Sequence, residues 1–204
     1  MKKVQVHPER CLGCRQCMFA CAAAHSRSQE AVGALAEQPR PRARVHVAAA
    51  GRHYLGFPNR CHHCEPAPCL LACLPGAISR EPATGTVMID PDLCINCASC
   101  AMACPFGVLR YAADWTAPAA KTVAIKCDNC LDRQLAGRLP ACVEACKTGA
   151  LTFEESDVAL ERKSREVARS LAVDGERETL LPPTVALLLE MKNGLAASND
   201  AADQ

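Results

Sequence analysis

Short apolar runs separated by polar turns make up most of the first 153 residues. Runs of four or five residues with β-branched and aromatic side chains predict short strands that pair as hairpins. These runs are Arg44–Val47 with His53–Phe57, Thr86–Asp90, Val108–Tyr111 and Val123–Lys126. Two turn sequences, Pro75–Ile78 and Thr148–Leu151, lead into further runs of the same kind. We therefore expect small hairpins connected by turns.

Helical periodicity takes over after residue 153. Glu154–Ala172 predicts a charged amphipathic helix, with an apolar stripe of Val158, Leu160, Val167 and Leu171. Thr184–Lys192 predicts a second helix that stops at Asn193 and Gly194, and residues 196–204 are expected to fray. These tail helices either cap the domain or offer an apolar face to a partner subunit.

An earlier segment, Gln29–Glu37, is also compatible with a helix and precedes the basic stretch Pro39–Arg44. That stretch is either a solvated loop or a docking surface for an acidic partner.

Composition indicates that packing of apolar side chains alone does not stabilise the fold of this chain. Half of the 204 residues are hydrophobic, but only seven are aromatic and 16 are cysteine. The N-terminus MKKVQVHPER lacks the apolar run of a signal peptide, and no stretch reaches the length of a membrane span. We therefore expect reduced thiols in the cytoplasm, in a protein that is either free or held at the inner membrane face through a partner.

Cysteine spacing indicates the kind of site. Two groups follow C-x2-C-x2-C-x3-C, a third follows C-x2-C-x4-C-x3-C, and a fourth follows C-x2-C-x11-C-x3-C. Three thiolates two residues apart can surround one face of an iron–sulfur cube, and the fourth ligates a neighbouring cluster. Zinc would need two separated pairs, so a third cysteine two residues later is surplus to it. The spacing therefore predicts four 4Fe-4S clusters, with a zinc-binding structural or interaction module as the remote alternative.

Charge and motifs narrow the function further. The formal charge of +1 becomes roughly −7 once sixteen thiolates hold four oxidised clusters of about −2 each. This argues against a nucleic-acid partner. No dinucleotide-binding or Walker motif is found, and no catalytic site can be assigned, so we expect a protein that is not itself an enzyme.

The chain resembles the four-cluster ferredoxin-like electron-transfer subunits of the dimethyl sulfoxide reductase type. The resemblance covers about residues 1–153 and rests on the order of the groups, on the segments Cys61–Cys69 and Cys94–Cys97, and on the long gap from Cys130 to Cys142. The opening Glu9–Cys17 and the sequence Ala24–Ser26 are most similar to the iron–sulfur subunit of anaerobic carbon monoxide dehydrogenase. The small subunit of tungsten aldehyde oxidoreductases comes second.

The resemblance implies an α+β fold of tandem bacterial-type dicluster ferredoxin units in residues 1–153, with a helical extension in 154–204. One lobe would hold the groups 11–21 and 127–146, and the other 61–104. Four sets of ligands are implied: Cys11, Cys14, Cys17 and Cys146; Cys21, Cys127, Cys130 and Cys142; Cys61, Cys64, Cys69 and Cys104; and Cys73, Cys94, Cys97 and Cys100.

The implied function is a relay of low-potential electrons. One partner would be a catalytic subunit, either carbon monoxide dehydrogenase or a tungsten or molybdenum aldehyde or formate oxidoreductase. The other would be a hydrogenase, flavoprotein or ferredoxin.

Several histidine, aromatic and basic residues could also act near the clusters. His62 and His63 lie between cysteines, where we expect orienting hydrogen bonds rather than ligation. His25 and His53 are expected to be ordinary surface or packing residues. Tyr111 and Trp115 either shield a cluster or simply pack. Lys121, Lys126 and Arg133 either raise the potentials of nearby clusters or are solvated.

Overall fold

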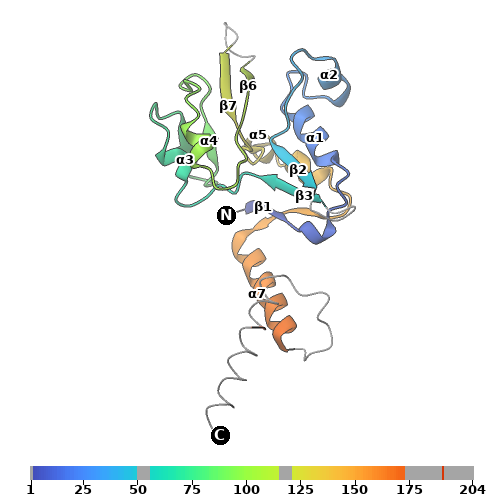
Figure 1. Cartoon of the computed structure of the whole chain (residues 1–204). Helices are drawn as coiled ribbons and strands as arrows, with labels where there is room; N and C mark the ends of the chain where they lie inside the picture. Colours follow the sequence, from blue (N-terminus) through green and yellow to red (C-terminus); the bar gives the residue numbers. More distant parts are fainter. Residues whose placement is uncertain (1, 50–55, 115–120, 173–189, 191–204) are drawn as a thin grey trace. The chain divides into compact units, whose positions relative to one another are not determined.

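The computed structural model describes residues 2–49, 56–114, 121–172 and 190 (Figure 1). The chain divides into two compact units, residues 1–155 and residues 156–204, and all the cysteines lie in the first. The first unit combines short helices with small sheets, in agreement with the α+β class predicted from the sequence.

Strands described in the first unit form four separate antiparallel pairs. They are β1 (Lys2–Val6) with β8 (Leu151–Glu155), β2 (Val45–Ala49) with β3 (Gly56–Arg60), β4 (Ile78–Arg80) with β5 (Val87–Ile89), and β6 (Arg110–Asp114) with β7 (Lys121–Ile125). Each predicted strand overlaps one of these, although the expected Val108–Tyr111 strand begins two residues late. His53 to Leu55 of another lie outside the described residues.

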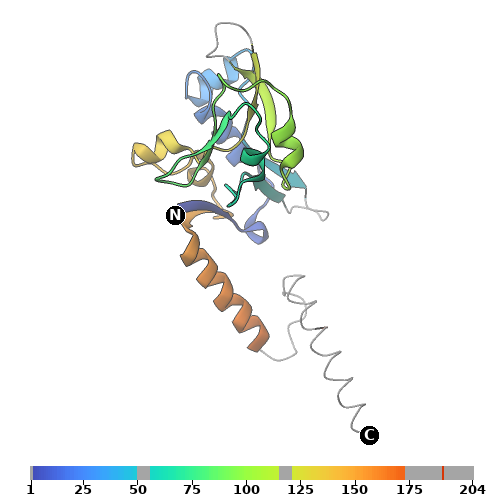
Figure 2. The same ribbon diagram turned by 90° about the vertical axis from the view of Figure 1, so that its left-hand side faces the viewer.

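The pair β1–β8 was not predicted as a pair. Figure 2 shows the two strands side by side, and Val4 lies opposite Phe153 while Val6 lies opposite Leu151. At the other end Lys2 faces Glu155 and Lys3 faces Glu154, a cross-strand arrangement of opposite charges that favours this register.

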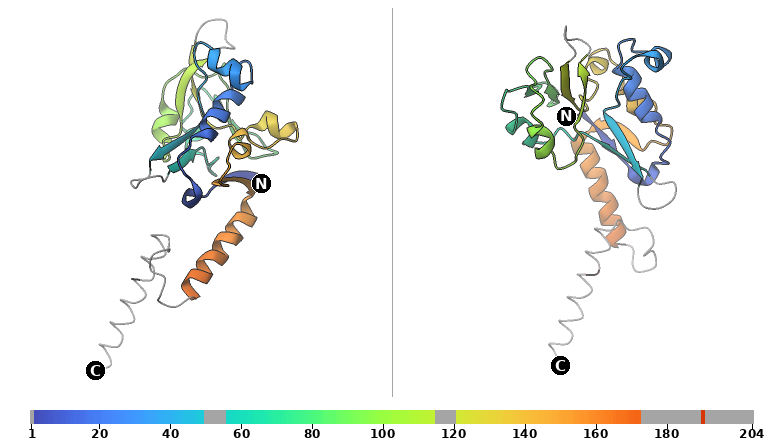
Figure 3. Two further views of the ribbon diagram at one scale, coloured as in Figure 1. Left: turned by 90° about the vertical axis from the view of Figure 1, so that its right-hand side faces the viewer. Right: turned by 45° about the horizontal axis from the view of Figure 1, so that its top comes forward.

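Short helices connect the strands. They are η1 (Pro8–Arg10), α1 (Gln16–Ala24), α2 (Ala31–Ala36), α3 (Pro68–Leu71), α4 (Ser99–Ala103), α5 (Leu131–Leu135) and α6 (Ala141–Glu144). The helix expected at Gln29–Glu37 is shorter than predicted because Gln29 has a φ of 53°. Helices α1 and α2 lie on one side of the β6–β7 hairpin and α3 and α4 on the other (Figures 1 and 3).

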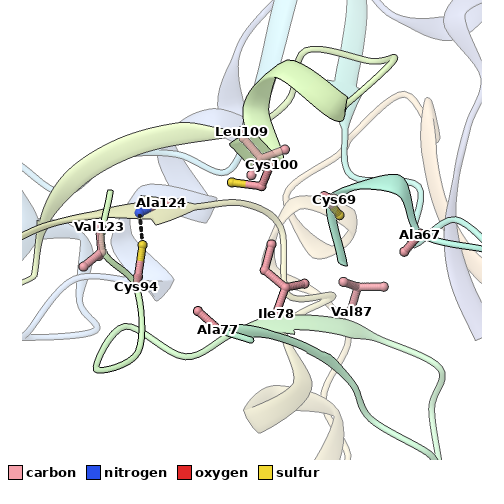
Figure 4. Close-up of a cluster of buried hydrophobic side chains, with 10 residues drawn as sticks. All are labelled: Ala67, Cys69, Ala77, Ile78, Val87, Cys94, Cys100, Leu109, Val123 and Ala124. Atoms are coloured by element: carbon pink, nitrogen blue, oxygen red, sulfur yellow. Dashed lines mark hydrogen bonds between the residues drawn. The ribbon is translucent and has the colours of Figure 1, made fainter. Parts of the chain in front are cut away.

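Two larger clusters of buried side chains stabilise the first unit. The central core consists of Ala67, Cys69, Ala77, Ile78, Val87, Cys94, Cys100, Leu109, Val123 and Ala124 (Figure 4). The terminal core consists of Val4, Cys17, Cys21, Val45, Cys142 and Leu151. Three of the six residues in the terminal core are cysteines, and aromatic side chains are absent from the buried members of both cores. Packing in both cores therefore depends on what the sulfur atoms bind.

The second unit is described as one helix, α7 (Ser156–Ala172). Its C-terminal end agrees with the predicted one, but it begins at Ser156 because Glu154 and Glu155 belong to β8. The second predicted helix, Thr184–Lys192, and the expected frayed end lie outside the described residues except for Glu190. Among the described residues, none of the helices is both long enough and apolar enough to cross a membrane.

Candidate metal centres

All sixteen cysteines lie among the described residues, and none of them forms a disulfide. Ten are buried and four are half-buried, whereas Cys14 and Cys97 are exposed. Thiols buried in such numbers, without oxidation partners, are typical of metal ligands.

Three hollows in the first unit are each lined by four cysteines. The first set is Cys11, Cys14, Cys17 and Cys146, the third is Cys61, Cys64, Cys69 and Cys104, and the fourth is Cys73, Cys94, Cys97 and Cys100. The empty space of each hollow, counted together with the solvent at its mouth, is about 320, 340 and 330 Å³ respectively. Each hollow is therefore an open space with four cysteines in its lining.

The second set is Cys21, Cys127, Cys130 and Cys142, all of them buried. Burial raises the pKa of Cys142 well above its usual value, and the charges of Cys127, Cys21 and Cys130 raise it further. The other three cysteines of this set therefore lie near Cys142. The structure thus brings together the four groups of cysteines that the family resemblance implies, while their ligation stays a prediction.

A left-handed residue shapes the loop of each cysteine group. In the first C-x2-C segment of each group, the residue before the second cysteine has a positive φ, and these residues are Gly13 (70°), His63 (48°), Asn96 (57°) and Asn129 (58°). Such a conformation costs a non-glycine residue free energy, although asparagine tolerates it well. In two loops the turn points a backbone N–H at the first sulfur: His63 N–H donates to Cys61 Sγ and Asn129 N–H to Cys127 Sγ, each at 3.4 Å.

Other backbone N–H groups also donate to sulfur. Arg44 N–H donates to Cys21 Sγ at 3.2 Å, and Ala124 N–H donates to Cys94 Sγ at 3.5 Å, the dashed line in Figure 4. Donors of this kind stabilise thiolates and tune the potential of a cluster held by them.

The x3 spacing links neighbouring sets. Cys17 and Cys21 lie four residues apart on α1, one turn of helix, and belong to the first and second sets. Cys142 on α6 and Cys146 just beyond it repeat the link. On the other side Cys69 and Cys73, and likewise Cys100 and Cys104, join the third set to the fourth through α3 and α4.

A small apolar cluster connects the two halves. Cys127 of the second set packs with Cys61 of the third and with Val108, and Cys104 packs against them. The four sets are therefore ordered in a line from first to fourth. The exposed cysteines, Cys14 and Cys97, belong to the two end sets.

Two buried cations lie where the second and third sets meet. Arg60 is 2% exposed and Lys126 is 4% exposed. The Arg60 guanidinium donates to Cys127 Sγ at 3.7 Å. Burial alone would lower the pKa of Arg60, but the charges of Cys127, Cys142 and Cys61 raise it. Of the two roles considered for Lys126, burial rules out that of a solvated side chain.

These cations provide a test of fit for an anionic metal–thiolate group. Burying a charge is costly unless an opposite charge is near, and among the described residues neither Arg60 nor Lys126 has a carboxylate partner. The Nε atom of Arg60 is buried and finds no acceptor there. Sixteen thiols in sets of four, next to uncompensated positive charge, fit iron–sulfur clusters well.

His25 is part of the second set's surroundings, which corrects the expectation of an ordinary packing residue. Its Nδ1–H donates to Cys21 O at 2.7 Å, with Cys21 Sγ at 3.7 Å, and its Nε2–H donates to Asp128 at 3.1 Å. Burial lowers the pKa of His25, but the bonds to Asp128, Cys130 and Cys21 outweigh it and raise the pKa to about 12. Arg44 also pairs with Asp128, so this basic residue faces inward, whereas Arg40 and Arg42 are exposed.

The remaining candidates have structural surroundings of their own. His63 is 1% exposed, and its Nδ1 accepts the N–H of Val87 at 3.0 Å. Burial and the charges of Lys126, Arg60 and Lys3 lower the pKa of His63 to about 2, so its ring is neutral. The ring of His62 packs on Phe106, with the ring centroids 4.0 Å apart.

Of the other basic residues, Lys121 donates to the carbonyls of Pro91 and Asp92, and Arg133 pairs with Glu144. Tyr111 packs against the central core. Trp115 and His53 lie outside the described residues.

Comparison with known proteins gives consistent matches. The family described as "4Fe-4S dicluster domain" matches residues 52–156. An "Iron-sulfur protein" of Rhodospirillum rubrum is 38% identical over 177 residues, which cover 82% of this chain and 91% of that protein. "Protein NrfC" of Escherichia coli K12 is 40% identical over 154 residues, 74% of this chain and 65% of NrfC. "Thiosulfate reductase electron transfer subunit PhsB" of Salmonella typhi is 38% identical over 171 residues, 81% of this chain and 84% of PhsB.

Proposed function

Because the chain belongs to the 4Fe-4S dicluster family of iron–sulfur proteins, we propose that it is an electron-transfer subunit with four clusters in a line. Each set of four cysteines would hold one cluster. The observation that carries the proposal is the linear order of the sets, with Cys14 and Cys97 exposed at its two ends.

A bound 4Fe-4S cluster supplies a one-electron store that changes oxidation state with little change in geometry. The residues of this chain hold the sulfur atoms, donate backbone N–H groups to them and exclude water. The first and second sets, and likewise the third and fourth, are linked by cysteines four residues apart, a rise of roughly 6 Å along a helix axis. Such closely spaced sites suit passage of electrons from one end to the other.

The two ends offer contact points to redox partners. Leu12 lies between Cys11 and Cys14, and Ile95 lies between Cys94 and Cys97; both are 63% exposed. The equivalent positions in the inner sets are His62, which is exposed, and Asp128, which is half-buried, and neither side chain is apolar. An apolar side chain beside an exposed ligand is suited to docking another protein close to a cluster.

For the partners we propose a catalytic oxidoreductase subunit at one end and a hydrogenase, flavoprotein or ferredoxin at the other. The resemblance of Glu9–Cys17 and Ala24–Ser26 favours a carbon monoxide dehydrogenase. A tungsten or molybdenum aldehyde or formate oxidoreductase is the second candidate. The name of PhsB supports the general arrangement, because it describes this relative as the electron transfer subunit of a thiosulfate reductase.

The test is the metal content of anaerobically purified protein. About 16 iron and 16 acid-labile sulfide per chain are expected, with electron paramagnetic resonance (EPR) signals of spin-coupled reduced cubanes after dithionite. About 8 iron per chain would indicate a protein with two clusters instead of four. Zinc without sulfide would overturn the proposal in favour of a zinc-binding structural or interaction module. Co-purification from the native host, with identification of the bound subunits, then decides between the catalytic partners.

A further inference from the structure

Arg60 and Lys126 connect the second and third sets in a reciprocal way. Arg60 directly precedes Cys61 of the third set, yet its guanidinium reaches Cys127 Sγ of the second set at 3.7 Å. Lys126 directly precedes Cys127 of the second set, yet its side chain lines the hollow of the third. Each cation thus adjoins one set in sequence and the other in space.

Hydrogen bonds hold both cations in place without neutralising them. Arg60 donates to Val4 O at 2.6 Å and to Asn129 Oδ1 at 3.4 Å. Lys126 Nζ donates to the carbonyl oxygens of Val87 and of Cys127, the latter at 3.1 Å. These acceptors are neutral, so the positive charges remain uncompensated by them.

The carboxylate nearest in sequence is already engaged. Asp128 pairs with His25 at 3.1 Å and with Arg44. Lys3, the other cation here, donates to His63 O at 3.2 Å and adds positive charge. The negative charge that offsets the buried cations must therefore come from the cysteine sets themselves.

We propose that Arg60 and Lys126 raise the reduction potentials of the two inner clusters, so that electrons entering at either end settle on the inner pair. This inference rests on the proposed function, since it concerns clusters held by the second and third sets. One added electron makes a cluster one charge more negative, with no bond made or broken. A fixed cation nearby stabilises the reduced form more than the oxidised form, and burial keeps salt from screening it.

The experiment compares Arg60→Gln and Lys126→Met with the wild-type chain. Each variant removes one charge and keeps most of the side-chain volume. Iron and sulfide are measured first, and a potentiometric titration followed by EPR then gives the potential of each cluster. We expect unchanged iron and a lower potential for an inner cluster, by a tenfold or greater change in its reduced-to-oxidised ratio. Each tenfold change is 59 mV for a one-electron couple.

Two further variants separate charge from structure. Arg60→Lys keeps the charge and is expected to retain the wild-type potentials. Lys121→Met removes a charge from β7, the strand that directly precedes Lys126, but at a half-exposed site. We expect this variant to leave the potentials of the two inner clusters unchanged.

Each outcome decides the inference. Full iron with unchanged potentials in Lys126→Met and Arg60→Gln would overturn it, as would an equal shift of the inner pair in Lys121→Met. If Arg60→Gln loses iron, Lys126→Met decides, because methionine fills the same hollow without a charge. Wild-type protein without iron and sulfide would instead overturn the proposed function, and the inference with it.

Discussion

Gly56 lies so close to the first set that a single methyl group there should disturb it. The residue begins β3, and its N–H donates to Cys11 O at 3.1 Å. A Cβ atom on Gly56 would lie 2.9 Å from Gly13 Cα, 2.9 Å from Val47 Cγ1 and 3.0 Å from Cys11 Sγ. The first contact is with backbone and the second with a β-branched side chain, so neither can yield by a simple rotation.

Gly56→Ala should therefore cost about 1–3 kcal/mol, the usual range for inserting a group into a packed site. For a chain of this size the apparent melting temperature should fall by roughly 2–12 °C. The displaced atoms belong to the Cys11–Cys14 loop, so the first set should lose its iron while the others keep theirs. Iron should fall from about 16 to about 12 per chain.

The matched control is Gly137→Ala. Gly137 has a φ of 70°, and a Cβ there would meet nothing within 4 Å. The left-handed backbone makes alanine cost about 1–2 kcal/mol, but no cysteine needs to move. Calorimetry and iron analysis on both variants separate a general loss of stability from a local clash. Full iron in Gly56→Ala, with an unchanged melting temperature, would refute the reasoning.

Three further outcomes are expected. Cys97→Ala should remove the fourth set's iron alone, leaving about 12 iron per chain by the same metal analysis, and a loss of all iron would contradict independent sets. Asp128→Asn leaves the charges of His25 and Arg44 without their partner, so the free energy of unfolding should fall by about 3–5 kcal/mol in denaturant titrations of holoprotein; an unchanged midpoint would show that these pairs are not needed. Removal of iron by a chelator should abolish cooperative unfolding of residues 1–155, because half of the terminal core is cysteine; a sharp thermal transition of the iron-free chain in circular dichroism would be inconsistent with this.

Local signals predicted the hairpins and the cysteine groups. The turn Pro75–Ile78 leads into β4, and the Thr148–Leu151 turn leads into β8, because glycine and proline determine such turns within a few residues. The partner of β8 was missed because Lys2–Val6 has only two apolar residues and pairs with a strand about 150 positions away. Pairing at that distance leaves no mark in a short sequence window.

The buried charges also could not be predicted from the sequence. An arginine before a cysteine, or a lysine after a strand, has the same appearance whether it faces water or a core. The sequence does not single out Arg60, and it predicts an ordinary surface or packing role for His25, because burial depends on segments far away in the chain. Asp128, which orients His25, lies 103 residues from it. One signal was available: both cations directly precede the first cysteine of an inner group.

The order of the segments along the chain also bears on biosynthesis. All ten buried residues of the central core lie between positions 67 and 124, and the third and fourth sets are complete once Cys104 has been made. The terminal core needs Val4 together with Leu151, and the first set waits for Cys146. During synthesis from the N-terminus, Cys11, Cys14 and Cys17 therefore emerge from the ribosome first, but Cys146, the fourth member of their set, emerges last. Until then these three thiols can react with oxygen or bind other metals. The length of this vulnerable period is therefore set by the number of residues between β1 and β8.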